Sequence, residues 1–333
     1  MIKIHKSLKE NVLSKRILIF ATPILLILFP AITTDYYILT ILIFANISAI
    51  FAASWDILAG VTGQFSLGHA LFFGVAAYVS GALNLFLGLS PWITIPLGGG
   101  FGVIVGFLVA LPSLRLKGPY FTVTSLIFPG ILGTLILMYP EITGGESGLY
   151  GLSPISNEIL ITYYASLVLM LGSIFILLQI ANSNIGLIFR SIRDDEDVAE
   201  ATGINTTKYK FLSFAISGFF AGIAGGFQAH ILMFAGPYVF STYYSFQVIL
   251  FAALGGIGTI IGSLGGAYLM AILNEILRDI TEFRVIVFAI VMLLIFRYLP
   301  KGIIRQIAIW FNIPLGLWRG LKKLRRKDNG SNS

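Results

Sequence analysis

The sequence predicts an all-α, polytopic membrane protein: a transmembrane helical bundle of about ten spans with both termini in the cytoplasm. Of its 333 residues, 57% are apolar and 11% are charged, whereas about 25% are charged in a typical soluble domain. No Asp, Glu, Lys or Arg occurs between Phe211 and Asn274, and a membrane helix needs only about 20 such residues. These observations exclude a soluble enzyme, a disordered protein and a nucleic-acid-binding module, despite a net charge of +7.

Apolar windows bounded by charged residues, Pro or Gly define the expected helices. In chain order they cover about 17–34, 36–55, 66–88, 92–112, 120–139, 159–181, 211–234, 240–254, 258–277 and 285–300. The first window is too long for a secretory signal and lacks a cleavage site before Asp35, so it is interpreted as a span. Residues 240–277 allow two short helices, or a long helix with a re-entrant segment.

The distribution of Lys and Arg predicts the orientation. With the N-terminus in the cytoplasm, 20 of the 22 cations fall on the inner side, and only Arg278 and Arg284 fall outside. The expected organisation is a cytoplasmic basic N-terminus (1–16), a transmembrane domain (17–300) with an inner loop at 182–210, and a cytoplasmic basic tail (301–333). The tail is expected to lie against anionic lipid.

Three glycine ladders place a Gly at every fourth residue, so that each ladder lies on one helix face and lets another backbone approach closely. They are Gly98, Gly102 and Gly106; Gly218, Gly222 and Gly226; and Gly258, Gly262 and Gly266. Ordinary close packing explains them. The first and third ladders are also five spans apart, as corresponding helices of an inverted five-plus-five repeat would be.

A segment rich in Gly and polar residues follows the second span, in a stretch that has no formal charge between Asp56 and Arg115. Non-helical backbone at membrane depth is tolerated where it is buried in protein or lines a wet cavity. The segment is therefore a candidate for the translocation pathway, and a polar packing cluster is the alternative. The candidate residues are Gly63, Gln64, Ser66, Gly68 and His69.

The inner loop predicts a short, charged cytoplasmic helix at about 192–202. Ser191 and Asp194 have the spacing of a capping box, and Gly203 suits the left-handed residue after a helix end. Thr206 or Thr207 would then cap the seventh span. A protein-docking element is favoured over a solvated surface helix. On the outer side, residues 143–154 predict either a rigid turn structure or an ordinary Gly-rich loop.

Several chemistries find no support in the residues. There is no Cys, no phosphate-binding G-x-x-x-x-G-K-[ST] loop and no hydrolase motif. Ion-coupled carriers place ionisable groups within their spans, and here the only candidates are Asp56, His69 and His230. No enzymatic activity and no metal site are expected, and the energy for transport should come from another subunit.

Five segments together resemble the LivM-type permease subunits of branched-chain amino-acid ABC importers, in the same order over about residues 36–300. They are Gly60–Gly74, Leu114–Phe121, Thr143–Leu149, the Ala-Glu-Ala-Thr-Gly-Ile run that ends at Ile204, and Phe246–Gly266.

This resemblance implies a permease that translocates Leu, Ile or Val across the cytoplasmic membrane of a prokaryote. It implies a second LivH-like permease, two cytoplasmic ATPases that hold ATP and Mg, and an extracytoplasmic binding protein, with no cofactor on this chain and no nucleic acid. It also implies that the inner loop couples to the ATPases through Arg190, Arg193, Asp194, Asp195, Glu196, Glu200, Ala201 and Gly203. The E-A-T-G sequence here departs from the E-A-A-x-x-x-G of many importers. A urea or short-amide importer, a self-sufficient secondary carrier and a membrane-embedded enzyme remain alternatives.

Overall fold

The computed structural model describes residues 23–277, apart from 32 and 117, and the single residues 290, 293 and 297. Residues 23–31, in the predicted first span, are helical. The predicted basic N-terminus, the rest of the first span, the loop with Arg278 and Arg284, nearly all of the tenth span and the basic tail lie outside the described residues.

The chain is helical almost throughout the described range, as the sequence predicts. The elements are α2 (Tyr36–Asp56), a π-helical turn (Ile57–Val61), α3 (Ala70–Leu87), α4 (Pro91–Arg115), α5 (Pro119–Ser125), α6 (Ile127–Met138), α7 (Pro140–Thr143), a 3₁₀ turn (Gly145–Ser147), β1 (Leu149–Tyr150), α8 (Ile159–Asn182), α9 (Asn184–Asp194), α10 (Glu196–Ala201), α11 (Thr206–Leu232), β2 (Phe234–Ala235), a 3₁₀ turn (Pro237–Phe240), α12 (Thr242–Gly255) and α13 (Ile260–Ile276). The strands β1 and β2 form one short antiparallel pair.

Six helical segments of the described range are long and apolar enough to cross a membrane. They match predicted spans two to seven, although the third begins at Ala70 and the seventh at Thr206. Residues 240–277 form two short helices, α12 and α13, bent by 112° about a short break. The described part of the chain thus has six spans, or seven if the bent pair is one broken span.

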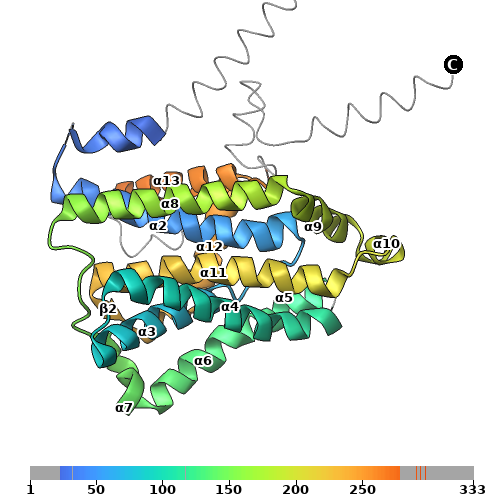
Figure 1. Cartoon of the computed structure of the whole chain (residues 1–333), viewed down its shortest axis with the longest axis horizontal. Helices are drawn as coiled ribbons and strands as arrows, with labels where there is room; N and C mark the ends of the chain where they lie inside the picture. The colour runs from blue at the N-terminus through green and yellow to red at the C-terminus, as the bar shows by residue number, and fades with distance from the viewer. Residues whose placement is uncertain are drawn as a thin grey trace, which may run out of the picture.

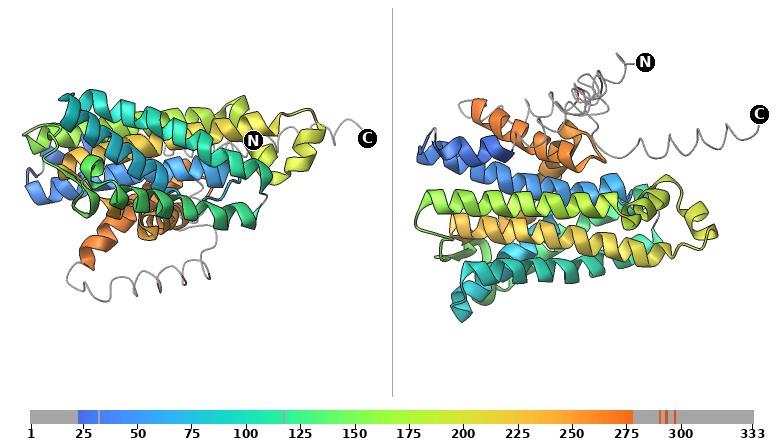
Figure 2. Two further views of the ribbon diagram at one scale, coloured as in Figure 1. Left: turned by 90° about the horizontal axis from the view of Figure 1, so that it is seen from below. Right: turned by 45° about the horizontal axis from the view of Figure 1, so that its top comes forward.

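Helix α11 lies at the centre of the bundle, between α2 on one side and α3 and α4 on the other (Figure 1). Helices α8 and α13 pack on α2, whereas α5 and α6 lie at the periphery (Figure 2). The two ends of the bundle differ in their content of Lys and Arg. Between residues 23 and 277, every described Lys and Arg lies at the end that carries α9 and α10, here called the cation-rich end. The opposite end carries α7 and β2 and the residues Glu141, Glu146 and Glu158, and is called the acidic end.

The first two glycine ladders pack against each other between α4 and α11. A Cβ added at Gly102 would overlap the carbonyl oxygen of Gly218, and one added at Gly218 would overlap that of Gly102. One turn away, a Cβ at Gly106 would lie 2.7 Å from the carbonyl oxygen of Phe214. Gly98, one turn in the other direction, turns its Cα–H toward Ala76 of α3, while its carbonyl oxygen lies 3.1 Å from a Cβ placed at Gly222 of α11. Glycine is required at the centre of this interface, because the two backbones are in contact there.

The contacts of the second ladder differ in closeness along α11. A Cβ at Gly222 would lie 3.0 Å from the Gly99 Cα, so this position is tight and a small shift is needed to admit a side chain. A Cβ at Gly226 would lie 3.4 Å from the Ile95 Cα of α4 and from Ser80 of α3. That distance is an ordinary van der Waals contact. Gly226 therefore packs against neighbouring helices, but less closely than Gly218 does.

The third ladder differs from the prediction of a single helix face. Gly262 and Gly266 lie on α13 and approach the backbone of α12, at Gly255 and Phe251. Gly258 lies before α13, in the turn between the two helices, with a φ of 83°. A left-handed residue ends a helix, so Gly258 belongs to the bend rather than to the ladder.

Candidate functional site

The turn between α12 and α13 is held against the end of α2 at the cation-rich end. Asp56 Oδ1 accepts a hydrogen bond of 2.6 Å from the Gly258 amide, and Arg193 Nη1 donates one of 2.9 Å to the Gly60 carbonyl. A Cβ at Gly60 would overlap both Asp56 and the Gly258 amide. These four residues, Asp56, Gly60, Arg193 and Gly258, are called the Gly60 junction. They join three separate parts of the chain: α2, the inner loop and the bent helix pair.

The predicted pathway segment is non-helical backbone inside the bundle. Gly63 has a φ of 81°, and a Cβ there would lie 2.7 Å from Arg193 Cγ. A Cβ at Gly68 would overlap the Ser125 carbonyl. The Trp55 indole donates to the Ser66 carbonyl over 2.8 Å. Close packing against neighbouring elements explains the two glycine positions and the serine position.

The two remaining candidates of this segment have different surroundings. His69 is fully buried, and its Nε2 lies 3.0 Å from Ser54 Oγ. Its Nδ1 has no hydrogen-bond partner in the described structure. The Gln64 side chain is partly exposed beside the start of α5. The assignment of these five residues to the pathway stays a prediction.

A second irregular segment, residues 236–241, leads from β2 into α12. Phe240 is buried against Gly74 of α3, at the position where a Cβ would stand. Ser245 Oγ accepts a hydrogen bond of 3.2 Å from the Ala70 amide, so the N-terminal turns of α3 and α12 meet. Gly225 of α11 touches Phe73 of the same α3 turn, well inside the span of α11. Helices α3 and α12 therefore begin side by side, against the interior of α11.

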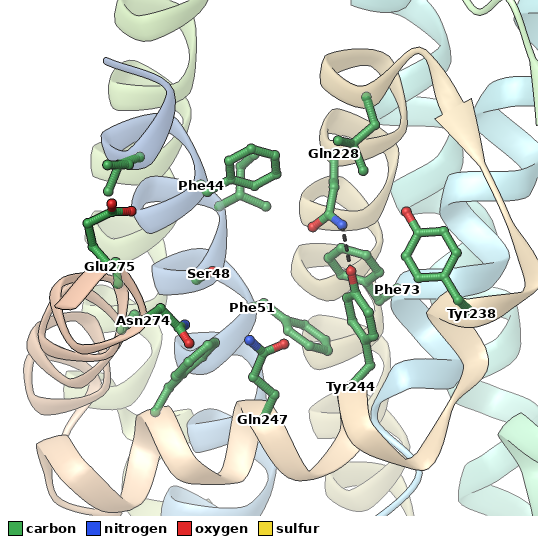
Figure 3. Close-up of a pocket in the computed structure, with 16 residues that line it drawn as sticks. Phe44, Ser48, Phe51, Phe73, Gln228, Tyr238, Tyr244, Gln247, Asn274 and Glu275 are labelled. Atoms are coloured by element: carbon green, nitrogen blue, oxygen red, sulfur yellow. Dashed lines mark hydrogen bonds between the residues drawn. The ribbon is translucent and has the colours of Figure 1, made fainter. Parts of the chain in front are cut away.

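A cavity of about 360 Å³ lies between α2, α11, α12 and α13, and is called the central cavity (Figure 3). It extends from Glu275 and Leu232, toward the acidic end, to Phe51, Phe73 and Phe251. Phe51 and Phe73 have ring centroids 4.7 Å apart. Along α2, the Gly60 junction lies about 13 Å beyond Phe51, at 1.5 Å per residue. The cavity thus ends at an aromatic floor above the junction.

None of the five predicted pathway residues lines the central cavity. His69 lies behind the floor, against Phe51, with ring centroids 5.2 Å apart. The cavity instead uses polar side chains that the sequence analysis did not single out. Gln228 and Gln247, both of which line the cavity, are the only glutamines in the uncharged stretch from Phe211 to Asn274, and this could have identified them.

The predicted helix at 192–202 is wrong in its bounds, because the loop forms two helices broken at Asp195. Ser183, rather than Ser191, caps α9, and Asp195 caps α10 by accepting a 3.0 Å hydrogen bond from the Val198 amide. Asn205, rather than Thr206 or Thr207, caps α11. The left-handed Gly203, with a φ of 88°, is confirmed. Asp195 interrupts the helix because a residue that caps a helix N-terminus adopts a non-helical backbone conformation.

The inner loop is fixed to the bundle by its basic residues. Arg190 donates to the Ala181 carbonyl of α8. Burial lowers the pKa of Arg190 and nearby Arg193 lowers it further, whereas Asp194 raises it. Arg193 also pairs with Asp194, with Nη2 and Oδ1 2.9 Å apart. The loop is thus attached at α8 and at the Gly60 junction.

The α10 helix is attached separately through a buried cation. Lys210 of α11 is only 2% exposed, and its Nζ lies 2.6 Å from Glu196 Oε1. The outward face of α10, including Val198, Glu200 and Ala201, is exposed, as is Gly203. Of the predicted coupling residues, four therefore hold the loop, namely Arg190, Arg193, Asp195 and Glu196. Glu200, Ala201 and Gly203 lie at the surface.

Residues 143–154 form an ordered turn structure at the acidic end. Four glycines adopt positive φ there, Gly144, Gly145, Gly148 and Gly151, and β1 pairs with β2. The buried His230 of α11 lies 2.8 Å from the Ser153 carbonyl through Nδ1. Of the two readings of this loop, the structure shows the rigid turn. In the described part of the chain, no group of three His, Asp or Glu residues is placed to hold a metal ion.

Helices that begin inside a bundle of membrane-spanning helices, beside a cavity, are typical of membrane transport proteins. Comparison with known families identifies the family of transport proteins. The chain belongs to the family described as the branched-chain amino acid transport system / permease component, whose model matches residues 37–296. No solved structure matches the chain.

Curated relatives include both types of permease subunit named for this system. The LivM permease protein of Salmonella typhimurium is 28% identical over 75% of this chain and 65% of its own length. The probable LivH permease protein of Methanocaldococcus jannaschii is 24% identical over 85% of this chain and 93% of its own. The nucleoside ABC transporter permease protein NupC of Lactococcus lactis is 23% identical over 68% and 76%. The chain therefore spans about two thirds of the length of the LivM relative.

Proposed function

We propose that this chain is a permease subunit of an ABC importer for branched-chain amino acids in the cytoplasmic membrane of a prokaryote. The family match and the LivM relatives support the substrate class. The chain itself performs no covalent chemistry in this proposal and binds no cofactor. A LivH-like permease, two cytoplasmic ATPases with ATP and Mg, and an extracytoplasmic binding protein complete the importer.

The orientation places the cation-rich end in the cytoplasm. The segregation of Arg115, Arg190, Arg193, Lys208 and Lys210 to one end supports this, since cytoplasmic loops carry an excess of Lys and Arg. Two hydrogen bonds connect α2 to the α12–α13 pair: Tyr37 donates to Glu275 near the acidic end, and the Gly258 amide donates to Asp56 at the cation-rich end. Ten spans with both termini in the cytoplasm remain the arrangement proposed.

An inverted five-plus-five repeat is part of the proposal. In each half, the second span ends in an irregular segment that leads into a helix beginning inside the membrane. These segments are 62–69, between α2 and α3, and 233–241, between α11 and α12. The chain passes through the two irregular segments in opposite directions. Helix α4 is then the fourth span of the first half and α13 the fourth span of the second, and both have glycines on one face. Matched breaks in two halves are characteristic of inverted-repeat transporters.

The Gly60 junction is the observation that carries the mechanism. The exposed face of α10 offers a docking surface for an ATPase on the cytoplasmic loop 182–210. Movement of that loop would pull Arg193 away from the Gly60 carbonyl, 2.9 Å distant, and leave the turn between α12 and α13 with only its hydrogen bond to Asp56. The central cavity ends just above that turn. ATP binding would in this way switch the cavity from outward to inward access, as a two-state element biased by the partner.

The test is uptake by the whole importer in proteoliposomes. The chain, its permease partner, ATPases and binding protein should accumulate labelled leucine, isoleucine and valine only when ATP is supplied. The chain alone should transport none of them. Accumulation by the chain alone in an ion gradient would establish a secondary carrier instead. Uptake of urea or acetamide, but of no aliphatic amino acid, would contradict the substrate class.

A further inference from the structure

Aromatic and polar side chains line the central cavity together. Phe44, Phe51 and Phe73 are among the first, and Gln228, Gln247 and Asn274 among the second (Figure 3). The cavity volume of about 360 Å³ lies in the range of about 300–1,000 Å³ that is usual for small-molecule sites. A molecule with both an apolar and a polar part can therefore contact both kinds of side chain.

The carboxamides of Gln228 and Gln247 are polar groups of the cavity lining. Gln228 Nε2 donates a hydrogen bond of 2.9 Å to Tyr244 Oη, which fixes both groups beside the cavity. The Gln247 side chain is half-buried and makes no hydrogen bond within the described residues, and its carboxamide points into the cavity (Figure 3). A carboxamide NH2 group donates hydrogen bonds, so Gln247 can bind the carboxylate of a zwitterion, for which the described lining offers no cation.

The charge of the lining limits what can bind. Its described residues include no Lys, Arg or His, and Glu275 is its one formally charged side chain. A ligand with a net negative charge would have no cation to pair with, and burying an unpaired charge is costly. A zwitterion is tolerated because its two charges compensate each other, and a cation would find Glu275.

The position of the cavity also fits a ligand site. Phe73 lies in the first turn of α3, and Tyr244 in the first turn of α12, which is where the two helices begin side by side. Transporters bind substrate near the bilayer midplane, at discontinuous helices. The aromatic floor and the Gly60 junction separate this position from the cation-rich end.

We propose that the central cavity is a substrate-binding site of this subunit within the membrane, and that it takes a small molecule with an aliphatic side group and no net negative charge, oriented by Gln247. The proposal rests on the proposed function for its substrate class. Specificity would then be set twice, first by the binding protein and again by Phe44, Phe51, Phe73 and Gln247 in this chain.

The experiment measures binding of labelled leucine to the purified permease and ATPase complex, without the binding protein. Gln247→Glu keeps the shape of the side chain and adds a negative charge, and Gln247→Ala removes the carboxamide. Both should raise the Kd for leucine by about tenfold or more. Gln179→Ala is the matched control, since Gln179 lies on α8, away from the cavity. Its Kd should equal that of the wild type.

Two ligands that differ from leucine in charge test the selectivity. Leucinamide, a cation, should displace labelled leucine, whereas 4-methylpentanoate, an anion with the same side group, should not. Equal leucine affinity in the wild type and Gln247→Glu, with equal uptake by the two, would overturn the site while leaving the proposed function intact. Effective competition by 4-methylpentanoate would overturn it as well. A wild-type importer that transports no aliphatic amino acid would instead contradict the proposed function.

Discussion

Two close glycine contacts in this molecule differ in the backbone that surrounds them. Between α4 and α11, Gly102 meets Gly218 in the middle of two continuous helices, with further backbone contact at Gly106. At the Gly60 junction, Gly60 meets Gly258 where one helix ends in a π-helical turn and another pair bends by 112°. Two side chains, Asp56 and Arg193, supply the hydrogen bonds there. The first contact is made by backbone against backbone, whereas the second also depends on two side-chain hydrogen bonds.

The largest effect is expected at the α4–α11 contact. Gly218→Leu should destroy most of the folded protein, because the new side chain would overlap the Gly102 carbonyl, a backbone group that cannot rotate aside. Overpacking of this kind costs about 1–3 kcal/mol or more. Gly100→Leu lies on the same helix α4, with nothing within 4 Å of its Cβ. It controls for helix propensity and should keep the wild-type unfolding temperature in detergent.

Gly60→Ala should separate the two regions. Its Cβ would push the Gly258 turn away from α2, while the α4–α11 contact is untouched. A penalty of about 1–3 kcal/mol shifts a two-state equilibrium by about 5- to 150-fold, so leucine uptake should fall by about that much, and the unfolding temperature should fall less than in Gly218→Leu. Gly172→Ala on α8, where the Cβ meets nothing, is the control. An unfolding temperature lowered as far as in Gly218→Leu would refute the distinction.

Arg193→Gln tests whether the junction transmits movement. Loss of its charged hydrogen bond to the Gly60 carbonyl should reduce uptake by about fivefold or more and weaken the stimulation of ATP hydrolysis by substrate. Lys208→Gln removes an exposed cation at the same end of the bundle and should change neither. Normal coupling in Arg193→Gln would show that the loop acts through another contact.

The smallest effect is expected at α10. Glu196→Gln leaves the buried Lys210 ammonium with a neutral partner, and this should destabilise the local structure by about 1–3 kcal/mol. Faster hydrogen exchange in α10 and the first turn of α11 would report it, with the central helices unchanged. Glu200→Gln, at an exposed position, should exchange as the wild type does. Lys210→Met combined with Glu196→Gln should cost less than the sum of the two single changes.

The continuous helices could be predicted from the sequence, and the site could not. Spans two to seven follow from uninterrupted apolar windows, and the Gly-rich segment after the second span predicts irregular backbone there, although the helical turns continue to Val61. At 256–259 the Gly-rich sequence permits both a packed helix and a turn, and the structure has a bend there that contacts Gly60. The central cavity combines α2 with helices about 200 residues later in the chain. A one-dimensional pattern shows that Gln228 and Gln247 are unusual, but not that they face the same space.

The spacing of the glycines likewise shows where two backbones can meet, but not how closely they do. Gly218 and Gly226 hold equivalent places in one ladder, yet only Gly218 lies against a backbone carbonyl. The difference depends on how α11 is placed against its neighbours, and that placement is set by side chains from other parts of the chain. A repeat of small residues therefore predicts the face of a helix that packs, and the structure is needed to say which turn of it makes the contact.

The backbone contact between α4 and α11 has a thermodynamic consequence. Where Gly102 meets Gly218, the opposing surfaces are peptide groups and Cα hydrogens, so no rotamer becomes frozen when the helices join. Ordering a long side chain elsewhere costs up to about 2 kcal/mol, whereas here that entropy loss is absent. Cα–H donors pointing at carbonyl oxygens add a weak attraction that lipid tails cannot replace. Helices α4 and α11 can thus stay associated in lipid, which provides no hydrophobic force to hold two helices together.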